Sequence, residues 1–293
     1  MGTYYIPRNY RGESRILYIF TVKSLISTSG FKFVFGDSVK HIPSYLCVDM
    51  SKLTSIEIPN SVISIDEKAF SGCSGLTSIE IPNSVTSIGE RAFSYCSGLT
   101  SVVWNAINCA DFTASPFSAS AANITSFTFG NSVEHIPNYL CYYMSKLTSI
   151  EIPNSVTSIG SYAFGGCSGI TEVHISDLAA WCKIDAANAW SRPTNANAKL
   201  YLNGELVENV VAPDGVESLG GWTFYNLSQI KSVIIPNSVT SLGYSSMENC
   251  VNLTDVVIGD GITTISQGSF SGCTALANLT MGNGIISIED NAF

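Results

Sequence analysis

The stretch Glu57-Ile58-Pro59-Asn60-Ser61-Val62 returns 23 residues later as Glu80-Ile81-Pro82-Asn83-Ser84-Val85 and occurs a third time as Glu151-Ile152-Pro153-Asn154-Ser155-Val156. Self-similarity at a fixed period of roughly 20–50 residues is typical of solenoids, propellers and other repeat arrays. Each copy is one unit of the array, so the period outweighs any local secondary-structure signal. The repeat therefore decides the fold class.

The residue before the proline, or its equivalent, marks each repeat. Most markers lie 23 residues apart. The step from Ile81 to Phe129 fits two repeats with two extra residues, and the step from Ile152 to Ala212 fits one repeat and a longer one of 37 residues. The markers are Phe35, Ile58, Ile81, Phe129, Ile152, Ala212, Ile235, Ile258 and Met281.

Apolar residues recur at fixed distances after the marker, as Val62, Ile65 and Phe70 do after Ile58. A single coil of this size has no interior, so these columns can be buried only when one coil stacks on the next. The segment Leu76–Pro82 alternates and is β-branched, which predicts a short strand that ends at the proline.

The expected fold is a right-handed solenoid with a short parallel β-sheet on one face and short helical or irregular segments opposite. The Ala-Phe pairs, such as Ala69-Phe70, are expected to form the short helical turns. Strands about 4.8 Å apart over roughly eleven coils predict a curved rod about 50 Å long.

One domain accounts for residues 34–293, with a longer coil at 174–211. Residues 1–33 do not follow the repeat and are expected to be an N-terminal cap or an unrelated leader. The segment Gly36–Pro43 recurs 94 residues later as Gly130–Pro137, which indicates that a block of four coils was duplicated.

Composition excludes several functional classes. The net charge is −9, and no cluster of Lys or Arg offsets it, so nucleic-acid binding is disfavoured. The longest apolar run near the start, Ile16–Val22, is too short to span a bilayer and has no small-residue cleavage site after it. We therefore expect neither a membrane-spanning segment nor a signal peptide.

The consensus Ile-Pro-Asn-Ser-Val-Thr-Ser-Ile-Gly-x-x-Ala-Phe-x-x-Cys-x-x-Leu-Thr-Ser resembles the BspA-like leucine-rich repeats over about residues 34–293. The long coil, from Val173 to Glu205, also looks like a variant seen in that family. The resemblance implies a leucine-rich-repeat solenoid that is extracellular or attached to a cell surface, where it serves adhesion or host-protein binding. It supplies no catalytic residues.

Five of the nine cysteines share one repeat position, fifteen residues after the marker, which Met or Leu occupies in other repeats. This exchange indicates an apolar, inward position and predicts buried free thiols. Cys47 and Cys141 fall in the phenylalanine column and have the same interpretation, whereas Cys109 and Cys182 lie in irregular repeats and are left open. The five are Cys73, Cys96, Cys167, Cys250 and Cys273, and the exceptions are Met50, Met144 and Leu227.

The sequence favours neither a cofactor site, nor a metal site, nor an enzyme. No Cys-x-x-Cys pair, nucleophile elbow, phosphate-binding glycine loop or His-Glu-x-x-His motif is present. His41 and His135 are copies of one repeat position, which common ancestry explains, and His174 is expected to be a solvated surface residue. The carboxylates at the Glu57 position form a column and do not converge as a catalytic pair would.

Two regions are candidates for partner binding. The first is the column of residues that point outward from the concave sheet. The column is acidic at its beginning and apolar further on, and an exposed apolar run suggests a contact surface. The preference of β-branched residues for strands explains the apolar run as well as partner binding does. The column consists of Glu57, Glu80, Val103, Thr128, Glu151, His174, Val211, Ile234, Val257 and Thr280.

The second candidate is the long coil, where Trp190 and Arg192 belong to the residue types enriched at interface hot spots. Burial of Trp190 as a plug of the coil is the favoured interpretation, and binding is the alternative. The coil should also contain a short helix capped by Asp177 or Ser176, with Trp181 in the core, and a hairpin turn at Asn203-Gly204.

The sequence therefore favours a non-enzymatic surface or secreted scaffold that binds a protein or glycan partner. A passive spacer that displays another domain is the alternative, and a carbohydrate-active or proteolytic enzyme is disfavoured.

Overall fold

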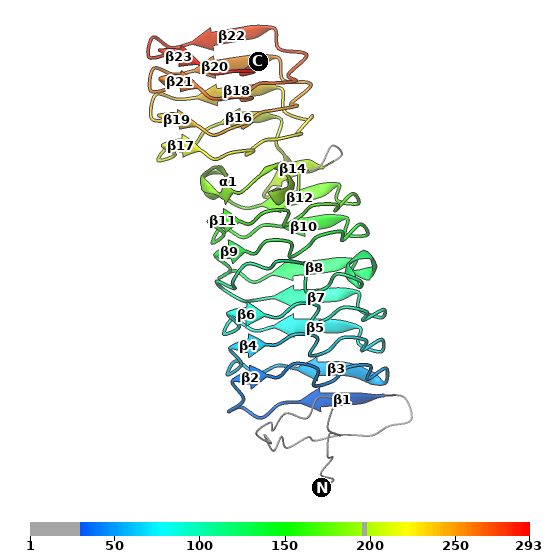
Figure 1. Cartoon of the computed structure of the whole chain (residues 1–293). Coiled ribbons are helices and arrows are strands. Elements are labelled where there is room, and N and C mark those ends of the chain that lie inside the picture. Colours follow the sequence, from blue (N-terminus) through cyan, green and yellow to red (C-terminus); the bar gives the residue numbers. More distant parts are fainter. Residues whose placement is uncertain (1–29, 195–197) are drawn as a thin grey trace.

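The computed structural model describes residues 30–194 and 198–293 and shows a rod of stacked coils (Figure 1). Each coil adds one strand to a row that we call the strand face. Neighbouring strands run parallel in the register of the repeat, so that Ser78 pairs with Ser101 and Ile79 with Val102. The solenoid is thus confirmed. The strands of this row are β1 (Phe31–Val34), β3 (Leu53–Glu57), β5 (Ser78–Ile81), β7 (Ser101–Trp104), β8 (Ser126–Phe129), β10 (Ser149–Glu151), β12 (Glu172–Ile175), β14 (Lys199–Leu202), β16 (Asn209–Val211), β18 (Ser232–Ile235), β20 (Asp255–Ile258) and β22 (Asn278–Met281).

Alternation along each strand sets which side chains reach solvent. In β5, Ile79 and Ile81 are buried, whereas Ser78 and Glu80 are exposed. Pro82 follows directly and has no N–H with which to continue the ladder, so the strand ends there. Because β1 begins at Phe31, the first coil includes residues 31–33. Residues 1–29 of the predicted cap or leader lie outside the described residues.

A second row of two-residue strands runs along one side of the rod (Figure 1). Ile65 is buried and pairs with Ile88 in the next coil. Two residues are too few for alternation to be recognised, so the sequence predicted only one sheet. The strands are β2 (His41–Ile42), β4 (Ser64–Ile65), β6 (Ser87–Ile88), β9 (His135–Ile136), β11 (Ser158–Ile159), β13 (Asp185–Ala186), β17 (Ser218–Leu219), β19 (Ser241–Leu242), β21 (Thr264–Ile265) and β23 (Ser287–Ile288).

The prediction of a helical turn at each Ala-Phe pair is wrong. The Phe70 N–H donates to the Ala92 carbonyl of the next coil, at 2.9 Å, and not to a carbonyl four residues earlier. Lys68 and Gly72 have φ values of 51° and 77°, so the chain turns back on itself twice within six residues. Alternate N–H groups can then point along the rod to acceptors in the neighbouring coil, which a helix would not allow.

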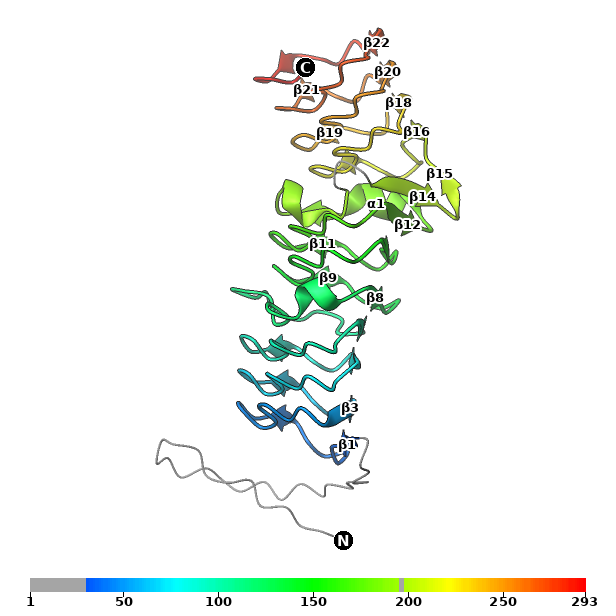
Figure 2. The same ribbon diagram turned by 90° about the vertical axis from the view of Figure 1, so that its right-hand side faces the viewer.

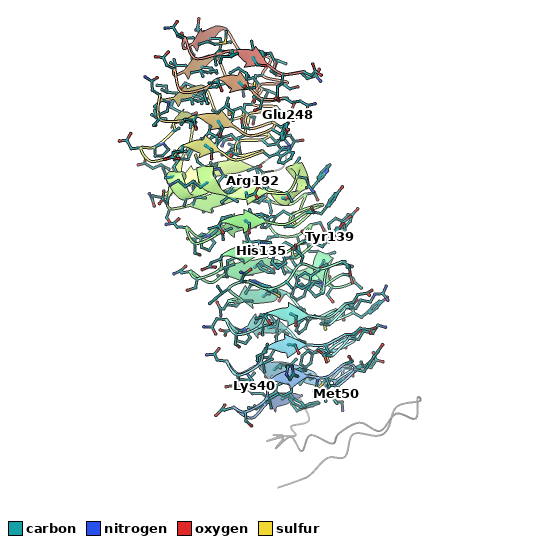
Figure 3. The ribbon with its side chains drawn as sticks, turned by 60° about the vertical axis from the view of Figure 1, so that its left-hand side comes forward. Lys40, Met50, His135, Tyr139, Arg192 and Glu248 are labelled. Carbon is teal, nitrogen blue, oxygen red and sulfur yellow. The ribbon has the colours of Figure 1, made fainter. Side chains whose placement is uncertain are left out.

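We call these stacked segments the turn row. Figure 2 shows it along the edge of the rod away from the long strands, and in Figure 3 Tyr139 and Glu248, from two of its segments, project from the same edge. The segments are 44–49, 67–72, 90–95, 138–143, 161–166, 221–226, 244–249 and 267–272.

The core follows the predicted columns. Phe70, Phe93 and Phe117 form a stack with centroids 5.4 Å apart at each step. The two extra residues of the coil between Trp104 and Phe129 accompany a short 3-10 helix, η1 (Ala121–Asn123).

The long coil contains an α-helix, a 3-10 helix and a hairpin. Asp177 caps α1 (Leu178–Lys183) by accepting hydrogen bonds from the Ala179 and Ala180 N–H groups, as predicted. A 3-10 helix, η2 (Ala189–Ser191), follows. The predicted hairpin joins β14 to β15 (Glu205–Leu206), and Asn203 and Gly204 both have positive φ, as a type I′ turn requires. In Figure 2 the hairpin projects beyond the line of the other strands.

The strand face is divided into four sheets. The described strands are not hydrogen-bonded between β3 and β5, between β8 and β10, or between the β14–β15 hairpin and β16. No helix among the described residues is long and apolar enough to cross a membrane.

Candidate functional site

The structure places the ten predicted column residues in one line along the strand face. Register pairs Glu80 with Val103, and Glu151 with His174. The same line also contains Tyr201 of β14, which pairs with His174 and was not predicted from the sequence. The alternation of Leu200 and Leu202 around Tyr201 was the signal that could have identified it.

The acidic part of the column is made of separate carboxylates. Glu57 forms an ion pair with Lys32, both exposed. Glu80 accepts a hydrogen bond from the Asn105 side-chain amide at 2.8 Å. The repeat carries these carboxylates up the rod one coil at a time, so they do not converge on a common point.

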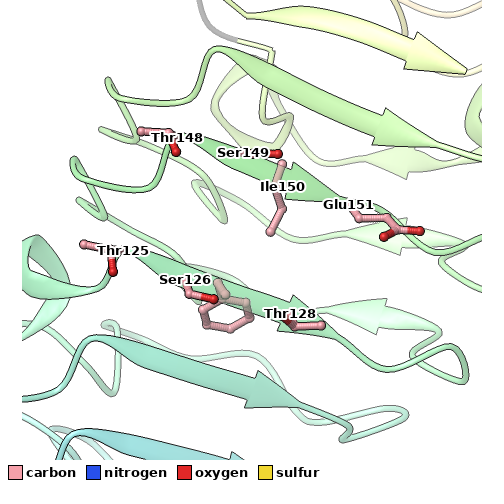
Figure 4. A pocket seen from close by; sticks show the side chains of 8 residues that line it. Thr125, Ser126, Thr128, Thr148, Ser149, Ile150 and Glu151 are labelled. Atoms are coloured by element: carbon pink, nitrogen blue, oxygen red, sulfur yellow. The ribbon is translucent and has the colours of Figure 1, made fainter. Parts of the chain in front are cut away.

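A shallow groove opens where β8 and β10 separate (Figure 4). Its volume is about 290 Å³, and hydroxyl groups dominate its lining. Glu151 contributes a carboxylate beside Thr128 at the end where the outward column crosses the groove. The lining residues are Thr125, Ser126, Phe127, Thr128, Thr148, Ser149, Ile150 and Glu151.

His174 stands next to this groove on β12. Its ring stacks on Tyr201 with centroids 5.1 Å apart, and its Nε2 lies 3.1 Å from the Glu172 carboxylate. The imidazole is half-buried by these neighbours. His174 is therefore a partly exposed residue of the strand face that these two neighbours hold in place.

The apolar part of the column lies beyond the hairpin. Val211, Ile234 and Val257 are neighbours across β16, β18 and β20, and they are 54%, 42% and 42% exposed. The hairpin thus separates a polar half of the strand face from an apolar half.

The two long-coil candidates have opposite environments. Trp190 is 59% exposed, so the favoured interpretation of it as a plug is wrong. Arg192 is only 3% exposed, so its assignment as a partner contact is also wrong. The Arg192 guanidinium donates to the Ile184 carbonyl at 2.9 Å and lies over the Trp181 ring, 4.6 Å from its centroid. Burial lowers the pKa of Arg192 to about 10.

All nine cysteines are free and buried, including Cys109 and Cys182, which the sequence had left open. Burial raises the pKa of the thiols, to about 12 for Cys96 and Cys182. Within the described residues no group of three or more His, Cys, Asp or Glu side chains is placed to hold a metal ion. The arrangement therefore offers a contact surface of hydroxyls, carboxylates and aliphatic groups.

The family described as BspA type Leucine rich repeat region matches the chain in six copies, over residues 27–142, 134–180 and 194–293. Among solved structures, a leucine-rich repeat protein from Bacteroides ovatus is 25% identical with a TM-score of 0.49, and the match covers 89% of this chain but only 63% of that one. A leucine-rich cell surface protein from Faecalibacterium prausnitzii is 22% identical over 97% of this chain and 87% of that one, with a TM-score of 0.43.

The pneumococcal vaccine antigen PcpA is 17% identical over 89% of this chain and 66% of that one, with a TM-score of 0.42. No curated protein matches the chain.

Proposed function

The chain belongs to the BspA-type leucine-rich repeat family, and from this premise we propose that it is a non-enzymatic scaffold, outside the cell or on its surface, whose strand face binds a protein or glycan partner. The location and the adhesive role rest on the family. The binding face rests on the side chains themselves.

The apolar run on the strand face is the observation that carries the proposal. Val211, Ile234 and Val257 form a contiguous exposed row, and a partner that covered them would gain about 25 cal/mol for each Å² of apolar surface removed from water. Thr128 and Thr280 satisfy the strand preference at the same position with a polar side chain, so the three aliphatic side chains add apolar surface that strand formation does not require.

The polar half of the strand face is suited to orient the bound partner. Glu151, the hydroxyl-lined groove and the fixed His174 ring offer hydrogen-bond acceptors and donors beside the apolar row. With a net charge of −9, the rod attracts partners of positive charge over distances of about a Debye length. A non-catalytic role agrees with the even spacing of the carboxylates along the rod.

The test is binding of the full chain to a panel of immobilised extracellular proteins and glycans, with Ile234→Asp as the variant. A charge in the middle of the apolar row should weaken binding at least about tenfold, because it must be desolvated under the partner.

Ile63→Asp is the matched control, since Ile63 is exposed to a similar extent but lies outside the strand face. Loss in Ile234→Asp with retention in Ile63→Asp supports the proposal. Equal binding by both variants would contradict the strand face as the binding surface, and no binding by the unmodified chain would indicate a passive spacer.

A further inference from the structure

The exposed aromatic side chains gather away from the strand face. Apart from Phe293, every exposed aromatic residue in the described ranges lies on the turn row or in η2, which takes the place of a turn segment in the long coil. The strand column, in contrast, exposes carboxylates, hydroxyls and aliphatic groups. The aromatic residues are Tyr45, Tyr95, Tyr143, Tyr162, Trp190 and Tyr244.

Most of these tyrosines occupy backbone positions that disfavour them. The second and sixth residues of each turn segment are left-handed, a conformation that costs free energy for any residue with a Cβ and least for Gly or Asn. Other coils use Gly72, Gly268, Asn226 and Asn249 at these positions, but also Lys68, Arg91 and Trp222, so the left-handed backbone belongs to the whole turn row. The tyrosines are kept at these positions although Gly or Asn would cost less. The tyrosines are Tyr45, Tyr95, Tyr139, Tyr143 and Tyr162, with φ between 56° and 62°.

Four tyrosines from two adjoining coils form a cluster. The rings of Tyr139 and Tyr162 are parallel, with an interplanar angle of 1° and centroids 5.6 Å apart. Tyr142 lies edge-on to both, and Tyr143 packs against Tyr142 at 4.4 Å. Tyr143 is 58% exposed, so the cluster forms part of the surface.

A glycine pair makes room for the cluster. A Cβ on Gly165 would lie 3.0 Å from the Tyr142 ring, and one on Gly166 would lie 2.8 Å from the Tyr143 ring. The corresponding pair one coil from Tyr45 is Ser71-Gly72, so only one of the two glycines recurs there. Trp190 belongs to the adjoining coil, where its carbonyl accepts a hydrogen bond from the Phe164 N–H at 3.2 Å.

The ring geometry distinguishes between kinds of partner. A sugar stacks on an open ring face, but here Tyr139 and Tyr162 turn one face towards each other, and Tyr143 lies with one side against Gly166. Tyr143 is 58% exposed, and such rigid amphipathic side chains suit contact with protein surfaces. Partial burial and the neighbouring tyrosines raise the pKa of Tyr142, so its hydroxyl stays protonated.

We propose that Tyr139, Tyr142, Tyr143 and Tyr162, with Trp190 in the adjoining coil, form a second contact surface that binds a protein of net positive charge. The cluster supplies an uncharged centre, and the net charge of −9 attracts a basic rim on the partner. This surface does not depend on the strand face, and the rod could hold a different partner on each.

The experiment selects ligands for the full chain from random peptides displayed on phage and measures their binding to three variants. Tyr143→Asn removes the exposed ring and places a residue that tolerates the left-handed backbone. Tyr95→Asn is the matched control, because Tyr95 has the same repeat position, a φ of 60° and 67% exposure but no ring contact with another described aromatic residue. Ile234→Asp reports on the strand face.

Selected peptides should be rich in Lys and Arg and should bind Tyr143→Asn at least about tenfold more weakly than the unmodified chain. Their binding to Tyr95→Asn and Ile234→Asp should be unchanged, and the Tm of Tyr143→Asn should be equal to or above that of the unmodified chain.

Three results would overturn the proposal. The first is that no peptide is enriched or that peptide binding survives Tyr143→Asn. The second is a clear fall in Tm for Tyr143→Asn, which would make the cluster a packing element. The third is Tyr143-dependent binding of neutral oligosaccharides, which would change the class of partner. Peptides that depend only on Ile234 would support the strand face and contradict the tyrosine cluster.

Discussion

At the scale of single residues, the buried cysteines do more than fill space. The thiol of Cys96 donates to the Phe70 carbonyl of the preceding coil at 3.2 Å, and that of Cys73 to the Cys47 carbonyl at 3.0 Å. Cys250 and Cys273 repeat the contact. The sequence predicted the burial of the cysteines correctly but not the hydrogen bonds that their thiols donate, because the Met and Leu residues at the same repeat position have no side-chain hydrogen to donate.

The thiols should therefore be unreactive in the folded protein. Burial raises the pKa of Cys96 from 9.0 to about 12, so little thiolate is present near neutral pH. Titration with a thiol reagent should detect few groups before denaturation and all nine cysteines after it. The same shift predicts a pH effect: the contribution to stability is complete below about pH 9 and is lost as the pH rises towards 12.

Rapid modification of most thiols in the native state, or stability that is constant up to pH 12, would contradict this account.

At the scale of elements, glycines control how closely coils approach. A Cβ on Gly98 would lie 2.5 Å from the Ser74 carbonyl oxygen, and one on Gly75 would lie 2.4 Å from that of Ser51. Neither glycine has a positive φ. The structure thus shows close packing of one coil's backbone on the next.

Gly98→Ala should lower the free energy of unfolding by about 1–3 kcal/mol, because the carbonyl it meets belongs to the backbone and cannot rotate away. Gly36→Ala is the control, since its Cβ would meet no atom within 4 Å. The control should stay within about 0.5 kcal/mol of the unmodified chain in urea unfolding. An equal change in the free energy of unfolding for Gly98→Ala and Gly36→Ala would show that the spacing between coils does not exclude a Cβ at residue 98.

At the scale of the whole molecule, the long coil joins two stacks of coils. Both β rows are interrupted there, and side chains replace part of the backbone ladder. Trp181 Nε1 donates a hydrogen bond to the Thr223 carbonyl at 3.0 Å. At the equivalent place one coil later, the donor is a backbone group, the Phe224 N–H, which donates to the Ser246 carbonyl. Arg192, buried between the two stacks, donates to Ile184 and lies within reach of the Gly221 carbonyl.

Arg192→Ala should weaken the coupling between the two stacks. Solenoid stability is approximately a sum of coil terms and nearest-neighbour interfaces, so a weakened interface lets each stack unfold separately. The loss should be about 2–4 kcal/mol, from the missing hydrogen bonds and the space left over Trp181. Urea unfolding followed by circular dichroism should change from one transition to two.

Arg91→Ala, at an exposed arginine of a regular coil, should leave the unfolding curve unchanged. A single transition in Arg192→Ala, with little loss of stability, would show that the β14–β15 region couples the stacks without Arg192.

The sequence by itself determined the features that repeat. The solenoid, the inward columns such as Val62, Ile65 and Phe70, the buried thiols and the outward line from Glu57 to Thr280 all follow from the period. Each of these residues has neighbours of equivalent sequence above and below, so its environment is set by the repeat. The local signals of the long coil, the Asp177 cap and the Asn203-Gly204 turn, were predictable because they depend on adjacent residues only.

Tertiary structure decided what does not repeat. Trp190 is exposed and Arg192 is buried, the reverse of what their residue types suggested, because neither has an equivalent in other coils and each depends on the coil that follows. The tyrosine cluster likewise needs Tyr139 to stack on Tyr162, and Gly165 and Gly166 to leave room for Tyr142 and Tyr143. Which side chains meet across coils depends on non-local packing, and a pattern along one chain does not contain that information.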